Sequence, residues 1–384
     1  MSSSNENNSG QIKMRDLKIL SDRISPGESN CITDISGVKV GQITLKRGEG
    51  KLCPGEGPVR TGVTAIIPGQ NVYNNPRPAA VEIINGYGKA AGLAQVGEVR
   101  ELSSPILLTN TLNVGSVSDA LVDYIIEKHP DMGIKSTTFN PVVLECNDGY
   151  LNDLQGRHVK KEHVLRAIRK ASSNAVCQGG RGAGTGMASF GFKGGIGTAS
   201  CCFEHEDKQH QMGCLVLNNF GKPGQLRIEG ISTARLQDLL DEVKERHEND
   251  GNNLGAEEKE GHSGKQACGS DGSIIIILAA DAPLPPHQLE RISRRATHGL
   301  GRTGSVSRHG SGDFVLAFSA DCSNDSFNNI PAEILNKYFR AAVEITEEAV
   351  LNSLIAAGTM TGRDENRVPG LPKDRLEEIF RSGI

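Results

Sequence analysis

The chain has 384 residues with a formal net charge of −4, and 37% of its residues are hydrophobic, enough for a sizeable core in one large or two medium domains. The small negative net charge does not suggest a basic surface that would bind nucleic acid. An aromatic content of 4% without Trp disfavours base stacking and an aromatic belt at a membrane interface. The longest apolar stretch, residues 273–280, is far shorter than a membrane span. We therefore expect a protein that binds neither nucleic acid nor membrane.

The first residues, MSSSNENNSGQIKMRD, contain no apolar segment typical of a secretory signal. We predict that residues 1–29 form a disordered tail and that a single folded domain follows from residue 30 to residue 384. The nine cysteines are odd in number, and none forms a Cys-x-x-Cys pair. Without a signal, reduced buried thiols are expected rather than a disulfide framework, which predicts a cytoplasmic protein.

Apolar and β-branched runs predict strands along most of the chain, at residues 31–45, 61–69, 105–110, 141–148, 192–204, 211–220, 273–283 and 313–321. Helical periodicity is found at residues 117–128, 161–171, 232–248, 287–299, 331–357 and 373–382. Because several strands follow one another directly, in two clusters bracketed by helices, we predict a layered α/β structure with much antiparallel pairing. A simple βαβ alternation fits this order poorly.

A glycine-rich segment at residues 178–197 raises the question of a nucleotide-binding loop. Such a loop would need a strand before it and a helix after it, or a Gly-Lys-Ser/Thr ending, and the sequence offers neither. We therefore expect tight turns that line a pocket.

The segment EHEDKQH, residues 204–210, could suggest a metal site. Its two histidines are five residues apart in an expected hairpin tip, which differs from the four-residue spacing on a helix found in zinc proteases. A solvated turn is the better interpretation, and no metal site is predicted.

A polar segment from about residue 249 to residue 272 is typical of a flexible linker. It ends at Ser273, where SIIIILAA begins a strand that we expect to be buried on both faces. The junction is either an ordinary loop that leads into a core strand or a point at which the chain is cut between Gly272 and Ser273. Cutting would give Ser273 a free α-amine with a pKa of about 7.7–8.0, which can accept the hydroxyl proton as in N-terminal-nucleophile enzymes. The residues alone leave both interpretations open.

A resemblance to a known family bears on this choice. The segment DGSIIIILAADAPLPPHQLERISRRATHGLGRTGS closely resembles the L-aminopeptidase D-amidase/D-esterase family, which includes the β-peptidyl aminopeptidases. The resemblance extends to NCITDISGVKVGQITL, GPVRTGVTAIIP, PILLTNTLNVGSV, NPVVLECNDGYLNDLQG, GTGMASFGFKGGIGTAS and EEAVLNSLIAAGTMTGRDENRVPGLP. It implies a four-layer αββα sandwich of the α/β (α+β) class and of the N-terminal-nucleophile type. It also implies self-cleavage between Gly272 and Ser273 into residues 1–272 and 273–384.

The resemblance further implies roles for individual residues. Ser273 matches the nucleophile, and Ser311 matches a second serine whose hydroxyl would bond to Ser273 and relay its proton. Two positions further the family usually carries Glu, whereas this chain has Asp313, whose side chain is one methylene shorter. Asn219 matches the asparagine that donates its side-chain amide to the tetrahedral oxyanion.

Two more residues concern substrate binding. Glu145 matches the acidic residue that pairs with the free amine of the substrate. Asn147 replaces the aromatic residue that often lines the family's substrate pocket, which implies a roomier or more polar pocket.

The resemblance thus implies a self-processing aminopeptidase that acts on small peptides, amides or esters with a free amine, through an acyl-enzyme on Ser273. It implies no cofactor, and a homo-oligomer assembled from the processed heterodimers. One alternative is an acyltransferase like the ornithine acetyltransferases, whose nucleophile is Thr. The other is a binding protein that has lost catalysis, which the changes at Asp313 and Asn147 would mark.

Overall fold

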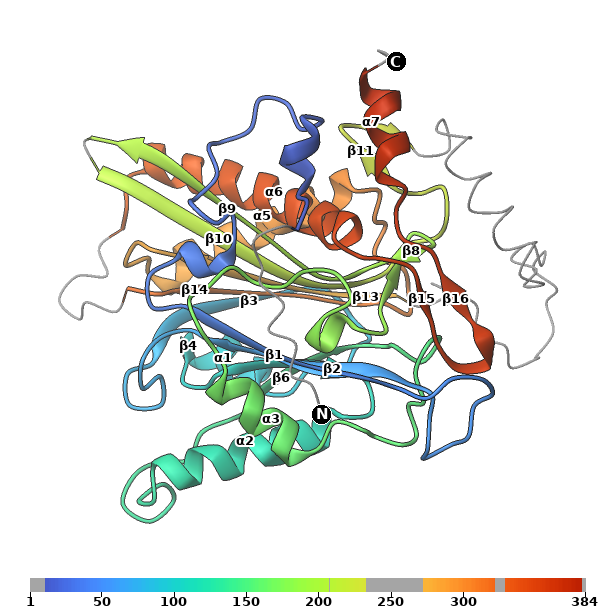
Figure 1. Ribbon diagram of the computed structural model, residues 1–384. Coiled ribbons are helices and arrows are strands. Elements are labelled where there is room, and N and C mark those ends of the chain that lie inside the picture. Colours follow the sequence, from blue (N-terminus) through green and yellow to red (C-terminus); the bar gives the residue numbers. More distant parts are fainter. Residues whose placement is uncertain (1–10, 207, 233–271, 322–328, 382–384) are drawn as a thin grey trace.

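Two β-sheets pack face to face in the computed structural model, and helices cover the outer side of each sheet (Figure 1). The structure describes residues 11–206, 208–232, 272–321 and 329–381. The expected helix at residues 232–248 and the linker at residues 249–272 lie outside these residues, except for Gly272 and for Ser232, which belongs to a short strand, Ile231–Ser232. No helix among the described residues is long and apolar enough to cross a membrane.

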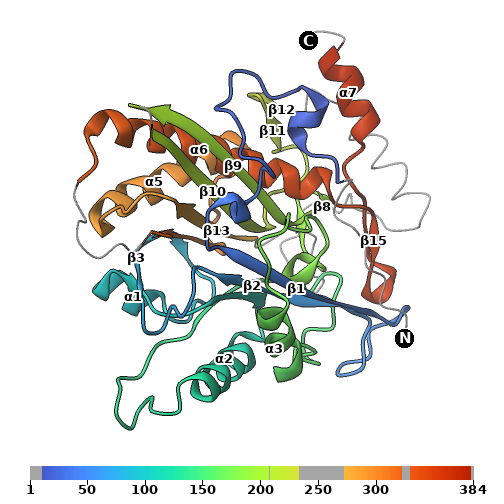
Figure 2. The same cartoon turned by 60° about the vertical axis from the view of Figure 1, so that its left-hand side comes forward.

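The smaller sheet has four strands in the order β1-β2-β5-β6. They are β1 (Lys39–Arg47), β2 (Val59–Ile67), β5 (Ile106–Asn110) and β6 (Val142–Cys146). Helices α2 (Val114–Lys128) and α3 (Lys161–Arg169) cover its outer face (Figure 2). Side chains alternate along each strand, so that Leu107 packs under the helices while Leu108 faces the other sheet.

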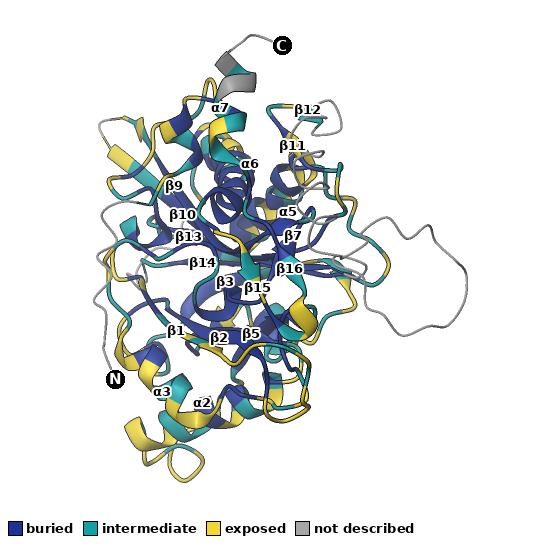
Figure 3. Cartoon of the chain, turned by 45° about the vertical axis from the view of Figure 1, so that its right-hand side comes forward, coloured by how far each residue is buried: buried dark blue, intermediate teal, exposed yellow. Residues whose placement is uncertain are grey.

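The larger sheet has six strands in the order β4-β3-β14-β13-β10-β9. They are β4 (Glu101–Leu102), β3 (Arg77–Gly86), β14 (Gly312–Ser319), β13 (Ser273–Ala280), β10 (Lys208–Asn219) and β9 (Gly195–His205). Helices α5 (Pro286–Arg302) and α6 (Ala332–Ile355) cover its outer face. In β13, Ile274 and Ile276 face these helices, and Ile275 and Ile277 face the smaller sheet. The strand is buried on both faces, as its run of isoleucines predicts (Figure 3).

The order helices, sheet, sheet, helices confirms the αββα sandwich. The remaining elements are α1 (Leu93–Val99), α7 (Lys373–Arg381), β7 (Ala188–Ser189), β8 (Phe192–Lys193), β11 (Arg227–Ile228), β12 (Ile231–Ser232), β15 (Met360–Thr361), β16 (Arg367–Val368), and the 3-10 turns η1 (Met14–Leu17), η2 (Ile32–Asp34), η3 (Gly182–Gly184) and η5 (Arg363–Glu365). The sequence did not predict β3 or α1, because β3 opens with Arg77-Pro78 and carries Glu82, and α1 is short and begins after Gly92.

The glycine-rich segment forms turns, as expected. Its 3-10 turn η3 is followed by the two-residue strands β7 and β8, and no helix follows of the kind that a nucleotide-binding loop requires. The EHEDKQH segment joins β9 to β10, which pair as an antiparallel hairpin from His205 and Lys208 onward.

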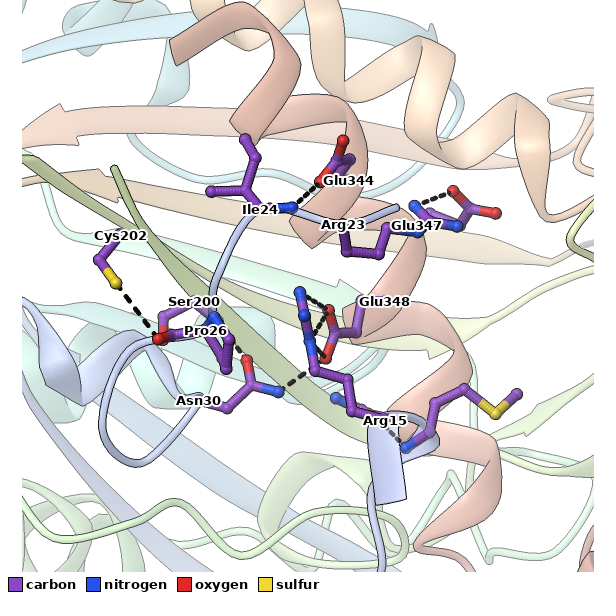
Figure 4. Close-up of polar contacts among 12 residues, drawn as sticks. Arg15, Arg23, Ile24, Pro26, Asn30, Ser200, Cys202, Glu344, Glu347 and Glu348 are labelled. Atoms are coloured by element: carbon purple, nitrogen blue, oxygen red, sulfur yellow. Dashed lines mark hydrogen bonds and ion pairs between the residues drawn. The ribbon is translucent and has the colours of Figure 1, made fainter. Parts of the chain in front are cut away.

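The N-terminal segment differs from the prediction of a disordered tail up to residue 29. Residues 11–29 lie along α6, where Met14 and Leu17 are buried. Arg15 pairs with Glu348, whose side chain is fully buried, and its Nε lies 2.8 Å from both carboxylate oxygens (Figure 4). The hydrophobic residues of this segment follow neither the helical nor the strand spacing. Its ordered structure depends instead on partners more than 300 residues away in the sequence.

Three glutamates of α6 hold this segment. Besides Glu348, Glu347 pairs with Arg23 at 2.7 Å, and Glu344 accepts the Ile24 amide at 2.8 Å (Figure 4). All three carboxylates are nearly inaccessible to solvent. A buried carboxylate is costly unless it is paired, so these contacts fix the N-terminal segment on the outer helical layer.

The Arg15–Glu348 pair gives a stability prediction. Arg15→Met leaves a fully buried carboxylate without its guanidinium, so the free energy of unfolding should fall by about 3 kcal/mol. Arg294→Met removes the same charge from an exposed pair with Glu290, and should lower the free energy of unfolding by no more than about 1 kcal/mol. Urea denaturation of both variants at pH 7 measures the difference.

The double variant Arg15→Met, Glu348→Met should recover part of the loss, because it leaves no unpaired charge. Equal effects of Arg15→Met and Arg294→Met would contradict an anchoring role for this pair.

Candidate active site

Four strand ends meet at one edge of the two sheets. In the larger sheet, β13 begins at Ser273 between the end of β10 and the start of β14. Asn219 lies opposite Ser273 in the antiparallel β10–β13 pair, and Ile274 lies opposite Asp313 in the parallel β13–β14 pair. In the smaller sheet, β6 ends at Cys146, and its side chain reaches across to the backbone of β13. The predicted site residues, which are far apart in the sequence, are therefore neighbours in the fold.

Ser273 is held by backbone and thiol groups. Its hydroxyl oxygen accepts the Gly312 N–H at 3.1 Å, and its carbonyl accepts the Cys146 thiol at 3.3 Å. The residue is only 6% exposed. The hydroxyl is thus fixed at the end of the strand, beside a backbone amide that can stabilise negative charge.

The residue before it must be glycine for steric reasons. A Cβ on Gly272 would lie 2.3 Å from the Phe220 Cα and 2.6 Å from the Asn219 carbonyl oxygen. Both neighbours are backbone atoms, which cannot move aside cheaply. The chain therefore passes through this point only without a side chain.

Ser311 and Asp313 form a hydrogen-bonded pair at the start of β14. The Ser311 hydroxyl lies 3.0 Å from Asp313 Oδ2 and 2.7 Å from the Arg308 carbonyl oxygen, and its one proton serves one of them at a time. No hydrogen bond joins the Ser311 and Ser273 hydroxyls in the described part of the chain. The Gly312 amide, and not the Ser311 hydroxyl that the resemblance implied, contacts the Ser273 hydroxyl.

Burial raises the pKa of Asp313, which is only 1% exposed. Hydrogen bonds from the Ser307 and Ser311 hydroxyls and from the Ile274 N–H oppose this effect. Asp313 thus lies beside the backbone at the Ser273–Ile274 junction.

Asn219 is oriented by two backbone groups. Its Oδ1 accepts the Ala188 N–H at 2.8 Å, and its Nδ2 donates to the Asn147 carbonyl at 2.9 Å. An amide nitrogen has two protons, so one remains for another acceptor. Asn219 pairs with Ser273 across the sheet, so an acceptor formed at the Ser273 hydroxyl could take this second proton.

Glu145 lies in β6, on the side of the smaller sheet. It is 2% exposed, its Oε1 accepts the Lys89 N–H at 2.9 Å, and its Oε2 accepts the Thr111 hydroxyl. Each carboxylate oxygen keeps a further lone pair, so a ligand ammonium could also be bound. The side chain of Asn147, by contrast, folds back to accept the Gly149 N–H at 2.9 Å.

Several residues that shape the site were not predicted from the sequence. The Gly312 amide and the Cys146 thiol contact Ser273, and Asn85 donates to the carbonyls of Arg308 at 3.0 Å and His309 at 3.1 Å. Asn85 belongs to β3, which the sequence pattern did not reveal. Backbone amides have no sequence signal at all.

The described residues do not form the groups of side chains that bind metal ions in proteins. Within residues 11–206, 208–232, 272–321 and 329–381, no group of three or more His, Cys, Asp or Glu side chains could hold a metal ion. The acid, amide and hydroxyl groups around Ser273 instead have the composition of a nucleophile with its oxyanion donors.

Comparisons with known proteins agree with this composition. The model of peptidase family S58 matches residues 30–368. The β-peptidyl aminopeptidase BapA of Sphingosinicella microcystinivorans is 41% identical over 364 residues, which cover 93% of this chain and 89% of that protein.

Two solved structures match over nearly their whole length. The PH0078 protein from Pyrococcus horikoshii OT3 is 42% identical, with a TM-score of 0.85 and coverage of 97% of this chain and 99% of that chain. The L-aminopeptidase D-Ala-esterase/amidase from Ochrobactrum anthropi is 32% identical, with a TM-score of 0.81 and coverage of 96% and 98%. The latter is described as a prototype for the serine aminopeptidases and a new variant among the Ntn hydrolase fold. The chain therefore belongs to peptidase family S58, and it is an aminopeptidase, a hydrolase of peptide bonds.

Proposed function

We propose that the protein cuts its own chain between Gly272 and Ser273 and then works as an N-terminal-serine aminopeptidase. The observation that carries this proposal is the position of Ser273. It is the first residue of a buried strand, with Asn219 on one side, the Gly312 amide on the other, and Gly272 in a place that admits no side chain.

In the processing step, the Ser273 hydroxyl attacks the carbonyl carbon of Gly272. An ester forms, the peptide C–N bond breaks, and the nitrogen of Ser273 takes up the hydroxyl proton. Water then hydrolyses the ester, which leaves a carboxylate on Gly272 and a free hydroxyl and α-amine on Ser273. Cutting thus creates the base that the serine lacks in the uncut chain.

In turnover, the α-amine of Ser273 takes the hydroxyl proton as the oxygen attacks the acyl carbon of the substrate. Asn219 and nearby backbone amides stabilise the oxyanion, and the α-ammonium then gives its proton to the leaving amine. Water hydrolyses the acyl-enzyme on Ser273. Asp313, with Ser311 bonded to it, stabilises the α-ammonium.

The proposed substrates are small peptides, amides or esters with a free amine, which Glu145 binds. The names of the relatives support this range, since one is a β-peptidyl aminopeptidase and another an esterase and amidase. We further propose that no cofactor takes part and that the processed heterodimers form a homo-oligomer in the cytoplasm. Burial raises the pKa of the thiols of Cys31 and Cys146, which fits structural, reduced cysteines.

The proposal predicts two fragments. Purified protein should run on a denaturing gel as residues 1–272 and 273–384, and N-terminal sequencing of the smaller fragment should begin at Ser273. Ser273→Ala should stay a single chain, because it lacks the attacking hydroxyl. A wild-type chain that remains uncut on prolonged incubation would contradict the proposal.

Glu145 gives a second prediction. Because a carboxylate facing an ammonium is a charge-assisted contact worth about 1.5–3 kcal/mol, N-acetylated peptides should be cleaved at least about tenfold more slowly than free ones. Glu145→Gln should lower kcat/KM on free peptides while the chain is still cut at Ser273. Equal turnover of acetylated and free peptides would rule out this role for Glu145.

Asp313 gives a third prediction, about pH. A carboxylate beside the α-ammonium favours its charged form and so raises the pKa of the amine. The amine acts as a base only when neutral, so kcat/KM should rise with pH through that pKa. Asp313→Asn should move this rise to lower pH and reduce the maximal rate by about 10²–10⁴-fold. The pH profile of fully cut enzyme measures both effects.

Asp313→Glu serves as the companion variant. Because Asp313 is 1% exposed and has three hydrogen-bond donors around it, its surroundings fit the shorter side chain, and we expect Glu to lower activity. A pH profile that neither variant changes would remove Asp313 from the mechanism and leave Ser273 in place.

A further inference from the structure

A small cavity lies beside the cut site, on the side of α5. It is lined by Gly272, Ser311 and Asp313 and by the loop at residues 305–308, which follows α5. Phe220, at the end of β10, also lines it. In the uncut chain the free space is about 10 Å³, which is room for about one water molecule. Because Gly272 is part of the wall, a cut after it would free space at this position.

The walls of the cavity are firmly held. A Cβ on Gly304 would lie 1.9 Å from the Gln225 carbonyl oxygen, so the loop packs directly on the chain that follows β10. Ser307 has a left-handed backbone with φ of 44°, and its hydroxyl bonds to Asp313. A serine in this conformation is strained, and such strain persists where the surroundings over-determine it. The loop is therefore fixed relative to the nucleophile.

Arg308 is the cation of this cavity. Its carbonyl accepts the Ser311 hydroxyl at 2.7 Å, so its backbone is tied to the site. Its Nε is buried, and among the residues that the structure describes this atom has no hydrogen-bond partner, nor does any carboxylate pair with the guanidinium. Arg15 and Arg23, by comparison, each have a glutamate partner. A buried guanidinium donor without a partner is costly, and a carboxylate is the group that its geometry fits best.

The cavity and Glu145 are built from different layers of the fold. Glu145 comes from β6 in the smaller sheet, whereas the loop at residues 305–308 follows α5 on the outer face of the larger sheet. Ser273 begins the strand between these two layers. A substrate with its ammonium on Glu145 and its acyl carbon at Ser273 therefore extends its leaving group toward the cavity.

We propose that this cavity is the leaving-group subsite, and that Arg308 binds the free C-terminal carboxylate of dipeptide substrates. The inference rests on the function proposed above and narrows its substrate class. The leaving residue would use the space freed by the cut after Gly272, and the hydroxyls of Ser305 and Ser307 give this region polar walls. A guanidinium holds a carboxylate through two parallel hydrogen bonds, so the leaving residue is oriented as well as bound.

The test compares free acids with amides. Alanyl-alanine and β-alanyl-alanine, each as the free acid and as the C-terminal amide, are given to fully cut wild-type enzyme, to Arg308→Gln and to Arg308→Lys. For whichever pair is cleaved, wild-type kcat/KM should be about tenfold higher on the acid, mainly through a lower KM. Arg308→Gln should bring the ratio of acid to amide to about one. Arg308→Lys, which keeps the charge but loses the fork, should give an intermediate ratio.

Arg294→Gln is the matched control, since it removes the same charge from an exposed position on α5, and its ratio should equal that of the wild type. A wild-type ratio of one, or a ratio that Arg308→Gln retains, would overturn the subsite while the aminopeptidase proposal stands. If no acid or amide is cleaved by any cut enzyme, the proposed function fails and the subsite fails with it.

Discussion

The site depends on the way three neighbouring chain segments fix the first residue of β13. The Asn219 and Gly312 backbones flank Ser273 within the larger sheet, and the Cys146 thiol reaches its carbonyl from the smaller sheet. A buried central strand cannot slide without breaking hydrogen bonds on both edges and repacking both faces. The hydroxyl and the amide donors around it therefore keep their geometry, because they belong to neighbouring strands of one sheet. Misplacement by about 1 Å can reduce a rate about 100-fold, so this rigidity serves the proposed chemistry.

The buried polar groups around Ser273 show how such a site is stabilised. Glu145 is held by the Lys89 amide and the Thr111 hydroxyl, Asp313 by three donors, and Asn219 by the Ala188 amide. Leaving any of these groups unpaired would cost more than a hydrogen bond contributes, so the fold itself orients them before substrate arrives. Burial nevertheless raises the pKa of Asp148, three residues after Glu145, to about 7, although Asn152 donates to it at 3.0 Å. The end of β6 is thus a region where charge is tolerated only with partners.

The sequence predicted the helices and strands that have a regular hydrophobic pattern. It did not predict segments whose ordered structure depends on residues far away in the sequence. Strands such as residues 273–280 and helices such as α2 and α6 follow directly from hydrophobic patterns, and a layered α/β structure with much antiparallel pairing follows from their order, whereas the four-layer αββα sandwich came from the resemblance. Residues 11–29 carry no such pattern, and contacts with distant residues, above all the glutamates of α6, explain their position. At the site, the junction of linker and strand raised Ser273 as one of two open interpretations, and the resemblance favoured it, whereas Asn219, Glu145 and Ser311 came from the resemblance alone. The Gly312 amide could not be found, because a backbone donor is the same in every residue.

In the proposed mechanism, Gly272 links activation to substrate binding. The same residue lies against the Phe220 backbone, which requires glycine, and forms a wall of the cavity at Arg308. Cutting the bond after it would release that wall and, in the same step, create the α-amine that serves as base. The uncut chain would then lack both the base and the space for a leaving group. Neither more space at the cavity alone nor an α-amine alone would produce an active site. A single covalent event would thereby control two requirements that most hydrolases meet with separate groups.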